Sequence, residues 1–480
     1  MKSRYVLGAA CAVALLPFSI SVSAQDTAAP LPPPPAPSES APATVQPGNA
    51  AVERRARRER AAAQMDDGDI MLVLARGDAT GFTGATRSDD FHYVCPIEAV
   101  RGAVLIERQD GHTRHHLYLR PRSPRGERWT GPTIGPGEDT AAEQAFDTAL
   151  PVGNLVPDVV RMLTAGRALY ISSAAPADGA QRRETLVEAV RAGLPSGVTL
   201  IRRDTRQRGA QKVEEQSDAN ARFVRSAAPI LTGLRATKSE TEIAYVRRAI
   251  DATVLGLLDT GRTLRPGLAE YQIQGLIEFR CKLAGCERQA FDSIVGSGPN
   301  SCILHYGANR RIMQDGDLVV VDVGGEYRGY AADVTRTFPV NGRFTKRQAE
   351  IYDAVLEAQK AGIAAVKPGV TLGQVHAAAK AVLEKHGLAR WFIHETSHSV
   401  GLNVHDVWGR SRKLEVGSIM TVEPGVYIPS ESLGVRIEDT LLVTEDGSIV
   451  LSAGAPKERD AVEALMAEDA PIPMTPPNPR

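Results

Sequence analysis

The sequence lacks a cysteine framework, an excess of charge of either sign and, beyond its first residues, any long apolar run. Five cysteines in 480 residues are too few for a disulfide-built scaffold. A formal net charge of -1 excludes a global field that would draw the chain to nucleic acid or to an anionic membrane surface. No later segment approaches the ~20 apolar residues that span a bilayer, so we expect no stable membrane insertion. Hydrophobic residues make up 43% of the chain, enough for large buried cores.

The first 24 residues have the pattern of a secretory signal peptide. Lys2 and Arg4 are positive, residues 6–20 are mainly apolar, and small residues up to Ala24 form a cleavage site. A membrane anchor is the alternative, but the apolar stretch is too short and Pro17 interrupts it. We therefore expect cleavage after Ala24 and a periplasmic or secreted protein.

Two proline-rich segments frame the part of the chain that we expect to fold. Residues 25–50 are rich in proline and nearly uncharged, which is typical of a disordered linker, and residues 468–480 form a similar tail. Between them we expect an amino-terminal α/β domain over residues 51–230 and a second domain over residues 231–467.

Short apolar strands alternate with helices in the expected amino-terminal domain. A helix that starts near Val52 carries five arginines, and the interspersed Glu53 and Glu59 favour a solvated helix face over a binding surface. The expected strands are 70–74, 103–106 and 116–119, and the expected helices are 142–149 and 183–193.

A helix start opens the second domain, where Ser239 and Glu242 form a predicted capping box ahead of apolar residues at helical spacing. Within this domain, Leu-Arg-Pro-Gly at 264–267 returns as Val-Lys-Pro-Gly at 366–369, and each separates two expected helices. Pro-Gly is common after a helix, but its return between two expected helices at the same relative position favours two similar halves. Two such halves predict a site between them.

Two aspartates stand in a predicted β-hairpin over residues 318–338. If the turn is centred between Tyr327 and Arg328, Asp322 and Asp333 lie opposite each other with Cβ atoms about 5 Å apart. Like charges this close in a buried hairpin require a cation or a shared proton. The alternative is a pair of aspartates that face solvent at the strand ends.

Three further residues extend this set. Glu423 and Glu438 are acids embedded in strand-like apolar runs, and His398 lies in a histidine-rich segment. Four carboxylates and one imidazole suit two hard or borderline divalent ions about 3.5–4 Å apart. A water that bridges two such ions is acidified enough to yield hydroxide near neutral pH.

A second pattern, His394-Glu395-Thr-Ser-His398, matches the HExxH zinc-protease motif. That motif requires a continuous helix, whereas the residues after His398 are β-prone and broken by Gly401. We expect instead a strand through residues 400–404, with His398 and His405 near its two ends.

The five candidate ligands resemble, in their order and local settings, those of the pita-bread metallopeptidases: aminopeptidase P, prolidase and methionine aminopeptidase. Residues 300–306 resemble the family segment with the first substrate-side histidine, here His305, and residues 394–406 resemble the family signature, with Glu395 in place of a small residue. Residues 52–65, 87–93 and 129–135, together with 451–457 and 463–466, resemble aminopeptidase P most closely.

The resemblance covers about residues 51–467 and implies an α+β fold, in which a pita-bread catalytic domain follows a smaller mixed α/β domain. It implies a dinuclear metalloaminopeptidase that removes the first residue from peptides with proline in second position, through attack by a metal-bridging hydroxide. The implied metal ligands are Asp322, Asp333, His398, Glu423 and Glu438, and the implied catalytic residues are Glu423 as general base, His405, His305, His394 and Arg436.

The oxygen-rich ligand set favours Mn²⁺, with Zn²⁺ and Co²⁺ as alternatives. The alternative functions are an Xaa-Pro dipeptidase (prolidase), an HExxH zinc protease and a metal-free binding module on the same fold. The oligomeric state stays open, with a homo-oligomer among the options.

Two cysteines lie close enough in sequence to pair in an oxidising compartment. Cys281 and Cys286 are five positions apart, and on one continuous helix they would not face each other well. The sequence therefore leaves this pairing open.

Overall fold

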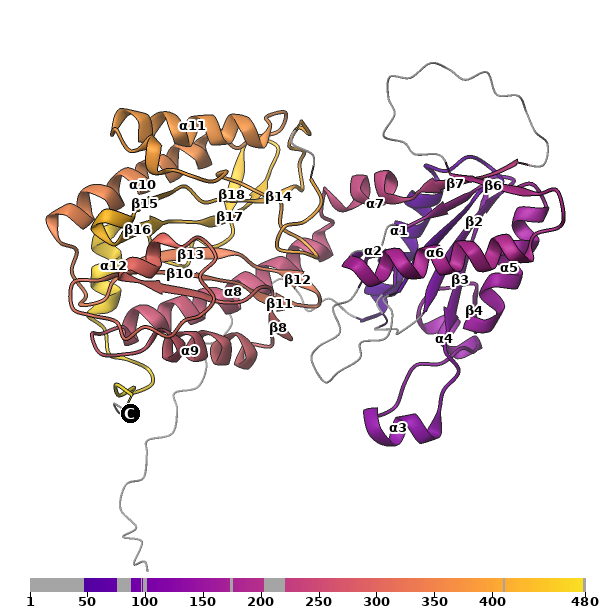
Figure 1. The fold of residues 1–480 in the computed structure, drawn as a ribbon, viewed down its shortest axis with the longest axis horizontal. Coiled ribbons are helices and arrows are strands. Elements are labelled where there is room, and N and C mark those ends of the chain that lie inside the picture. Colours follow the sequence, from indigo (N-terminus) through magenta and orange to yellow (C-terminus); the bar gives the residue numbers. More distant parts are fainter. Residues whose placement is uncertain are drawn as a thin grey trace, which may run out of the picture. The chain divides into compact units, whose positions relative to one another are not determined.

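A seven-stranded mixed sheet forms the centre of the amino-terminal part of the protein (Figure 1). This computed structural model describes residues 47–75, 88–95, 97, 102–172, 176–202, 221–408 and 411–477. The strand order is β4-β3-β2-β1-β5-β7-β6. The strands are β1 Ile70–Leu74, β2 Ala103–Gln109, β3 His112–Leu119, β4 Thr148–Pro151, β5 Leu169–Ile171, β6 Thr199–Arg202 and β7 Ala221–Ser226.

Apolar composition explains why β1 is central. All five residues of this strand are buried, which matches a continuous apolar run covered on both faces. The strands predicted over 70–74, 103–106 and 116–119 are confirmed, as is the helix over 183–193. The helices of this part are α1 Pro47–Ala62, α2 Asp89–Val94, α3 Pro124–Thr130, α4 Glu138–Glu143, α5 Leu155–Thr164, α6 Pro176–Gly193 and α7 Ala228–Arg235.

The helix predicted over residues 142–149 is wrong. Helix α4 covers only the first two residues of this stretch, and β4 begins at Thr148, near its end. Ala145 takes a positive φ of 54°, and the amide of Phe146 returns to the carbonyl of Ala141 at 2.8 Å, which closes α4. Phe146 is then buried in the core, so tertiary burial decides where the helix stops.

The prediction of a solvated arginine-rich helix is also wrong. Arg57 and Arg58 of α1 are 2% and 0% exposed. Arg57 donates to the Tyr330 hydroxyl at 3.3 Å and pairs with Glu242 at 3.5 Å, and Arg58 donates to the carbonyl of Val94 at 2.8 Å. A guanidinium group can be buried when several acceptors meet its donors, and α1 is therefore a packed element that binds residues of the second domain.

The second domain contains two helix pairs, as the repeated Pro-Gly segments predicted. Figure 1 shows α8 (Glu240–Thr263) and α9 (Glu270–Leu283) on one side of the strands and α10 (Lys346–Ala365) and α11 (Leu372–Lys385) on the other. The amide of Gly267 donates to Met313 O at 2.8 Å, and the amide of Gly369 donates to Leu414 O at 2.9 Å. The same bond recurs in both halves. The capping box at Ser239 is also confirmed.

The strands between the helix pairs form small sheets that carry the candidate ligands. One sheet joins β13, β10 and β9, a second joins β14, β17 and β18, and β15 pairs with β16. The bounds are β8 Arg288–Gln289, β9 Ile294–Ser297, β10 Leu318–Val323, β11 Gly325–Tyr327, β12 Tyr330–Ala331, β13 Val334–Pro339, β14 Ile419–Val422, β15 Gly425–Ile428, β16 Leu433–Arg436, β17 Asp439–Val443 and β18 Ser448–Val450, and the last helix is α12 Arg459–Met466. Short 3₁₀ helices occupy Val152–Asn154, Gly298–Cys302, Ala389–Trp391 and Pro429–Glu431.

The hairpin register predicted for the two aspartates is wrong. Asp322 pairs with Thr335 rather than with Asp333, and Tyr327 pairs with Tyr330. The turn residues are therefore Arg328 and Gly329, both with positive φ (50° and 84°), as the tight turns favoured in hairpins require. The glycine sets the turn one position later than expected, and Asp333 lies diagonally across from Asp322.

The described residues test the predictions for the carboxy-terminal tail and for the domain boundary, but not those for the first 46 residues. The expected signal peptide and the expected linker up to residue 46 lie outside the described residues. Residues 468–477, expected to be disordered, make defined contacts: Glu468 pairs with Arg262 at 2.7 Å, and Thr475 O accepts from Gln272 at 2.9 Å. The boundary expected at residue 230 falls inside α7, and the described residues on its two sides belong to one compact unit. None of the helices in the described residues has the length and apolar content needed to cross a bilayer.

Candidate metal centre

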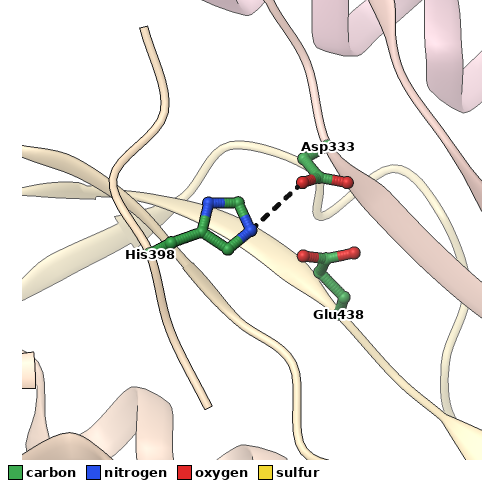
Figure 2. A group of neighbouring side chains, drawn as sticks. All are labelled: Asp333, His398 and Glu438. Atoms are coloured by element: carbon green, nitrogen blue, oxygen red, sulfur yellow. Dashed lines mark ion pairs between the residues drawn. The ribbon is translucent and has the colours of Figure 1, made fainter. Parts of the chain in front are cut away.

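Three of the five predicted ligands point toward one another. Figure 2 shows the side chains of Asp333, His398 and Glu438 meeting at one place. One ligand atom of each lies within 4.8 Å of the others, and His398 Nε2 is 3.3 Å from Asp333 Oδ2. Asp333 directly precedes β13, Glu438 directly precedes β17, and His398 lies beside the single bridge that Ser399 forms with Met420 of β14. Three segments far apart in sequence thus supply the cluster.

The other two predicted ligands adjoin this cluster. His398 Nε2 is also 3.3 Å from Glu423 Oε1, which places Glu423, at the end of β14, on the same imidazole. Asp322, from β10, is 8% exposed, and its charge acts on both Asp333 and Glu438. The structure therefore groups Asp333, His398 and Glu438, sets Glu423 against the same imidazole, and places Asp322 near enough for its charge to act on the group.

The electrostatics of the cluster call for a cation. Burial raises the pKa of Asp333 to about 7, and the charge of Asp322 adds to the rise while His398 opposes it. Burial and the neighbouring carboxylates, Asp333 first, raise the pKa of Glu438 well above its usual range. Burial opposes charge on His398, but hydrogen bonds to Asp333 and Glu423 outweigh it and raise the pKa of the imidazole. Four carboxylates so close together ionise fully only beside added positive charge.

Unpartnered oxygens test whether this cation is a metal ion. Asp322 Oδ1, Asp333 Oδ1 and Glu438 Oε1 are buried and have no hydrogen-bond partner within the described part of the chain. Asp322 Oδ2 accepts from Arg436 at 2.7 Å, and Glu438 Oε2 accepts from Thr335 at 2.7 Å. Buried acceptors are normally satisfied, so three left open in one place fit the coordination of hard divalent ions.

The predicted catalytic histidines surround this cluster. The rings of His405 and His398 meet edge to face with centroids 4.3 Å apart, and His405 is exposed on its other side. Burial, then the charge of His398, lower the pKa of His405, and His305 adds to this effect, which places the exposed His305 in the same neighbourhood. His405 therefore contacts the cluster, and His305 is exposed and lies close enough to His405 for its charge to act on it.

A hydrogen-bonded chain links Arg436 to His394 through a residue that the sequence reasoning missed. Arg436 Nη1 donates to the Tyr427 hydroxyl at 2.8 Å, and this hydroxyl lies 2.9 Å from His394 Nε2. His394 Nδ1 is 2.9 Å from the carbonyl of Glu395, so Nδ1 carries the proton and Nε2 accepts from Tyr427. Gly425 makes room for this phenol, because a Cβ there would meet the Tyr427 hydroxyl, but the sequence alone does not show this close approach.

The HExxH interpretation is not supported. The described residues 392–398 contain no helix, and Glu395 is exposed, with its carboxylate 3.8 Å from His376. The strand expected over residues 400–404 is also wrong, because the amide of Gly401 donates to Asn403 O at 3.0 Å and the chain turns there. This turn, rather than a strand end, presents His405 to the cluster.

Two related helix-and-sheet halves that enclose buried carboxylates and an imidazole define a metal-dependent hydrolase of the pita-bread class. Residues 244–445 match Metallopeptidase family M24. The Xaa-Pro aminopeptidase of Escherichia coli is 33% identical over 450 residues, which cover 86% of this chain and 97% of that protein. The Haemophilus influenzae Xaa-Pro aminopeptidase is 32% identical over 85% of this chain and 96% of its own length.

Solved structures agree with these relatives. Proline aminopeptidase P II from Yersinia pestis superposes with a TM-score of 0.77 at 30% identity and covers 87% of this chain and 99% of its own. By contrast, the Xaa-Pro dipeptidase of Pyrococcus horikoshii, at 36% identity, matches only 49% of this chain. The chain belongs to the Xaa-Pro aminopeptidases of metallopeptidase family M24, which confirms the predicted fold class and the predicted enzyme class, a metalloaminopeptidase.

Proposed function

We propose that this protein removes the amino-terminal residue from peptides with proline in second position. The observation that carries the proposal is the set of open, buried oxygens on Asp322, Asp333 and Glu438, next to His398, in a chain that matches Xaa-Pro aminopeptidases over most of its length. An Xaa-Pro bond has no amide hydrogen, so a site that fits the ring and needs no N–H can discriminate against ordinary peptides.

Five residues would hold two divalent ions: Asp322, Asp333, His398, Glu423 and Glu438. We propose Mn²⁺ as the preferred ion, because oxygen ligands outnumber nitrogen ligands four to one in this set. When bound, the ions supply positive charge that acidifies water and stabilises an oxyanion. Arg436 keeps Asp322 in place by bonding the oxygen that faces away from the open position.

Glu423 is the proposed general base. Its carboxylate accepts a proton from the attacking water and passes it to the proline nitrogen, so that the bond from the carbonyl carbon to nitrogen breaks and the new amine leaves protonated. Burial opposes charge on Glu423, but His398 and Arg436 nearby lower its pKa, and bound dications would favour its ionised form in the same way. A base that stays ionised at neutral pH can accept the proton of water.

The histidines have separate proposed tasks. His405, in contact with the cluster, and His305, close to His405, would donate hydrogen bonds to the scissile carbonyl as negative charge develops. His394, held through Tyr427, would shape the pocket for the proline ring. Burial lowers the pKa of His394, so this residue presents a neutral surface to an apolar ring.

Substrate comparison tests the proposal. Xaa-Pro-Yaa tripeptides should be cleaved, whereas Xaa-Pro dipeptides and Xaa-Ala-Yaa tripeptides should be poor substrates. Each metal is added back after chelation, and Mn²⁺ should restore more activity than Zn²⁺ or Co²⁺. Preferential cleavage of the dipeptide would make the protein a prolidase. Glu395→Ala should retain activity and Asp322→Ala should lose it, and the reverse result would support an HExxH protease.

We also propose that the protein is exported and that cleavage follows Ala24. The basic residues, short apolar stretch and small-residue site of the first 24 residues support this. Amino-terminal sequencing of protein from periplasmic and cytoplasmic fractions tests it: a mature chain that starts at Gln25 is expected outside the cytoplasm. Light scattering of the same material measures the oligomeric state.

A further inference from the structure

The end of helix α9 returns the chain toward its own last turn. The amide of Cys286 donates to Cys281 O at 3.0 Å, and the amide of Gly285 donates to Lys282 O at 3.1 Å. Gly285 has a φ of +100°, which belongs to the left-handed side of conformational space. These two bonds and this φ define the Schellman motif, in which the residues that share the outer bond also tend to bring their side chains together.

The two cysteines therefore contact each other. Both are buried, at 0% and 3% exposure. A hydrogen bond from Cys286 lowers the pKa of the Cys281 thiol, and the same bond raises the pKa of Cys286. Both Sγ atoms lie within 3.5 Å of the point that a Cβ on Gly325 would occupy, so the absence of a side chain at Gly325 provides the space for the two sulfurs.

The objection drawn from the sequence does not hold in this geometry. Two residues five apart on a continuous helix face away from each other. The α9 helix ends at Leu283, however, and Cys286 lies beyond the glycine that reverses the chain. Cys286 therefore lies outside the helix, and helical geometry does not separate its side chain from that of Cys281.

We propose that Cys281 and Cys286 form a disulfide bond when the chain folds in the presence of a disulfide oxidant. The Cys281 thiolate attacks one sulfur of the oxidant disulfide, which breaks the oxidant S–S bond, forms a mixed disulfide and releases the first oxidant thiolate. The Cys286 thiolate then attacks the Cys281 sulfur, which breaks the mixed disulfide and releases the second oxidant thiolate. The oxidant gains two electrons, and the two protons lost by the cysteines end on its two thiols. Because both sulfurs are buried in the folded protein, the exchange takes place during folding.

The disulfide would brace the base of the ligand-bearing hairpin. The amide of Glu287 donates to Glu326 O at 2.9 Å, and the amide of Ala290 donates to Gly324 O at 2.8 Å. The segment that starts at Cys286 thus pairs with the strand that follows Asp322. A disulfide at the end of α9 would restrict the conformations of this segment in the unfolded chain, and it would limit local opening of the pairing between this segment and residues 324–326.

Tryptic mapping tests the proposal directly, because trypsin cleaves after Lys282, between the two cysteines. The full chain is refolded with oxidised glutathione, denatured without reduction, treated with iodoacetamide and digested. The expected product is residues 281–282 joined to residues 283–288, at a mass lower by two hydrogens than the separate peptides, while Cys95 and Cys302 are alkylated. Alkylation of both Cys281 and Cys286 in this sample would overturn the proposal.

Two further measurements separate pairing from its surroundings. A reductant should lower the melting temperature of the oxidised protein by about 3 °C, and this shift should vanish in the Cys281→Ala/Cys286→Ala variant but persist in Cys302→Ala. If reduction of the Cys281–Cys286 disulfide leaves the melting temperature of the protein unchanged, the disulfide does not brace the hairpin. Protein isolated from the periplasm should carry the linked peptides as well; linked peptides after refolding but free thiols in the cell-derived protein would support the pairing and count against export.

Discussion

Arg436 holds one oxygen of Asp322 and leaves the other open. Its Nη2 donates to Asp322 Oδ2 at 2.7 Å, while Oδ1 has no partner among the described residues. The guanidinium thereby restrains the rotation of the carboxylate and leaves Oδ1 buried and available to another partner. The same arginine reaches Tyr427 and through it His394, so one buried cation contacts both a candidate metal ligand and the hydrogen-bonded chain to the candidate pocket residue.

Replacement of Arg436 should therefore weaken metal binding as well as turnover. Arg436→Lys keeps the charge but not the fork that reaches Asp322 and Tyr427 together. Removal of such an outer partner typically costs about 10–100-fold in metal affinity or activity. Titration of chelated protein with Mn²⁺, followed by peptide hydrolysis, measures both effects.

The matched control is Arg347→Lys, because Arg347 is a half-exposed arginine that pairs with Glu431 at 2.8 Å. It should bind Mn²⁺ as the parent protein does. If Arg436→Lys also leaves the Mn²⁺ affinity and kcat unchanged, Arg436 has no role in placing Asp322.

Glu423→Gln should lower kcat by about 10²–10⁴-fold, the usual contribution of general acid–base catalysis. The amide cannot accept a proton from water, although it remains similar in shape. Steady-state hydrolysis of an Xaa-Pro-Yaa peptide at saturating Mn²⁺ measures the effect. Glu395→Gln, the same substitution at an exposed glutamate, should keep kcat within a factor of two or so of the parent. Equal loss in the two variants would remove Glu423 as the specific base.

Metal removal should lower thermal stability as well as abolish hydrolysis. Binding to the folded state alone stabilises by about 2.7 kcal/mol when the free ion is at 100 times its dissociation constant. The melting temperature of chelated protein should therefore rise by several degrees when Mn²⁺ is added. Asp333→Asn should show little of this rise, and a full rise in that variant would place the ion elsewhere.

His115 predicts a loss of stability in acid that is unrelated to the metal centre. Its ring is fully buried, neither nitrogen has a partner within the described residues, and burial lowers its pKa from 6.5 to about 3. The unfolded chain therefore binds more protons between pH 6.5 and pH 3. The free energy of unfolding should fall by about 1.4 kcal/mol per pH unit as pH drops through this window, with no contribution above it.

Urea denaturation at several pH values measures this slope. His115→Leu should reduce the slope of the unfolding free energy against pH, because leucine cannot bind a proton. His112→Leu, at an exposed position of the same strand, should leave this slope unchanged. Identical slopes in the parent and in His115→Leu would mean that His115 is protonated in the folded protein.

Arg235 should be essential for the stability of the turn that carries His405. It is 6% exposed and pairs with Asp406 at 2.5 Å and with Asp90 at 2.8 Å, and Asp406 is otherwise met by Lys238 at 3.3 Å. Breaking a buried ion pair from one side typically costs about 3–5 kcal/mol. Arg235→Ala should lower the urea midpoint accordingly and also reduce kcat, because Asp406 adjoins His405.

The exposed pair of Arg347 and Glu431 again supplies the control. Arg347→Ala should change the free energy of unfolding by less than about 1 kcal/mol, since surface ion pairs contribute little. If Arg347→Ala and Arg235→Ala lower the free energy of unfolding by similar amounts, burial does not make the ion pairs of Arg235 more important for stability than an exposed pair.

Much of the local structure could be predicted because it depends on neighbours in sequence. The capping box at Ser239 needs only two residues three apart, and β1 needs only an apolar run. The four candidate carboxylate ligands could be chosen because acids embedded in apolar runs are rare unless something pairs with them, and His398 was added from the histidine-rich segment. The predicted hairpin register was wrong because it assumed that the two aspartates face each other. The position of a two-residue turn is set by the residues that tolerate a positive φ, here Gly329 in particular.

Other failures share a different cause, namely partners that are remote in sequence. The arginines of α1 have the composition of a solvated face, but Tyr330 and Glu242 meet Arg57 from the second domain. Tyr427 was overlooked because a tyrosine in an apolar strand has no local mark of function. Its role depends on Arg436 from the paired strand β16 and on His394 from a separate loop.

The sequence by itself determined which residues are candidates for the chemistry, where the main helices of the second domain begin, and that this domain consists of two related halves, because these properties follow from residue type and short-range spacing. Only the tertiary structure decided which oxygen of each carboxylate is already bonded and which stays open. It also decided which cations are buried and whether Cys281 faces Cys286. These outcomes depend on distances between segments, and a distance is set only after the whole chain has packed.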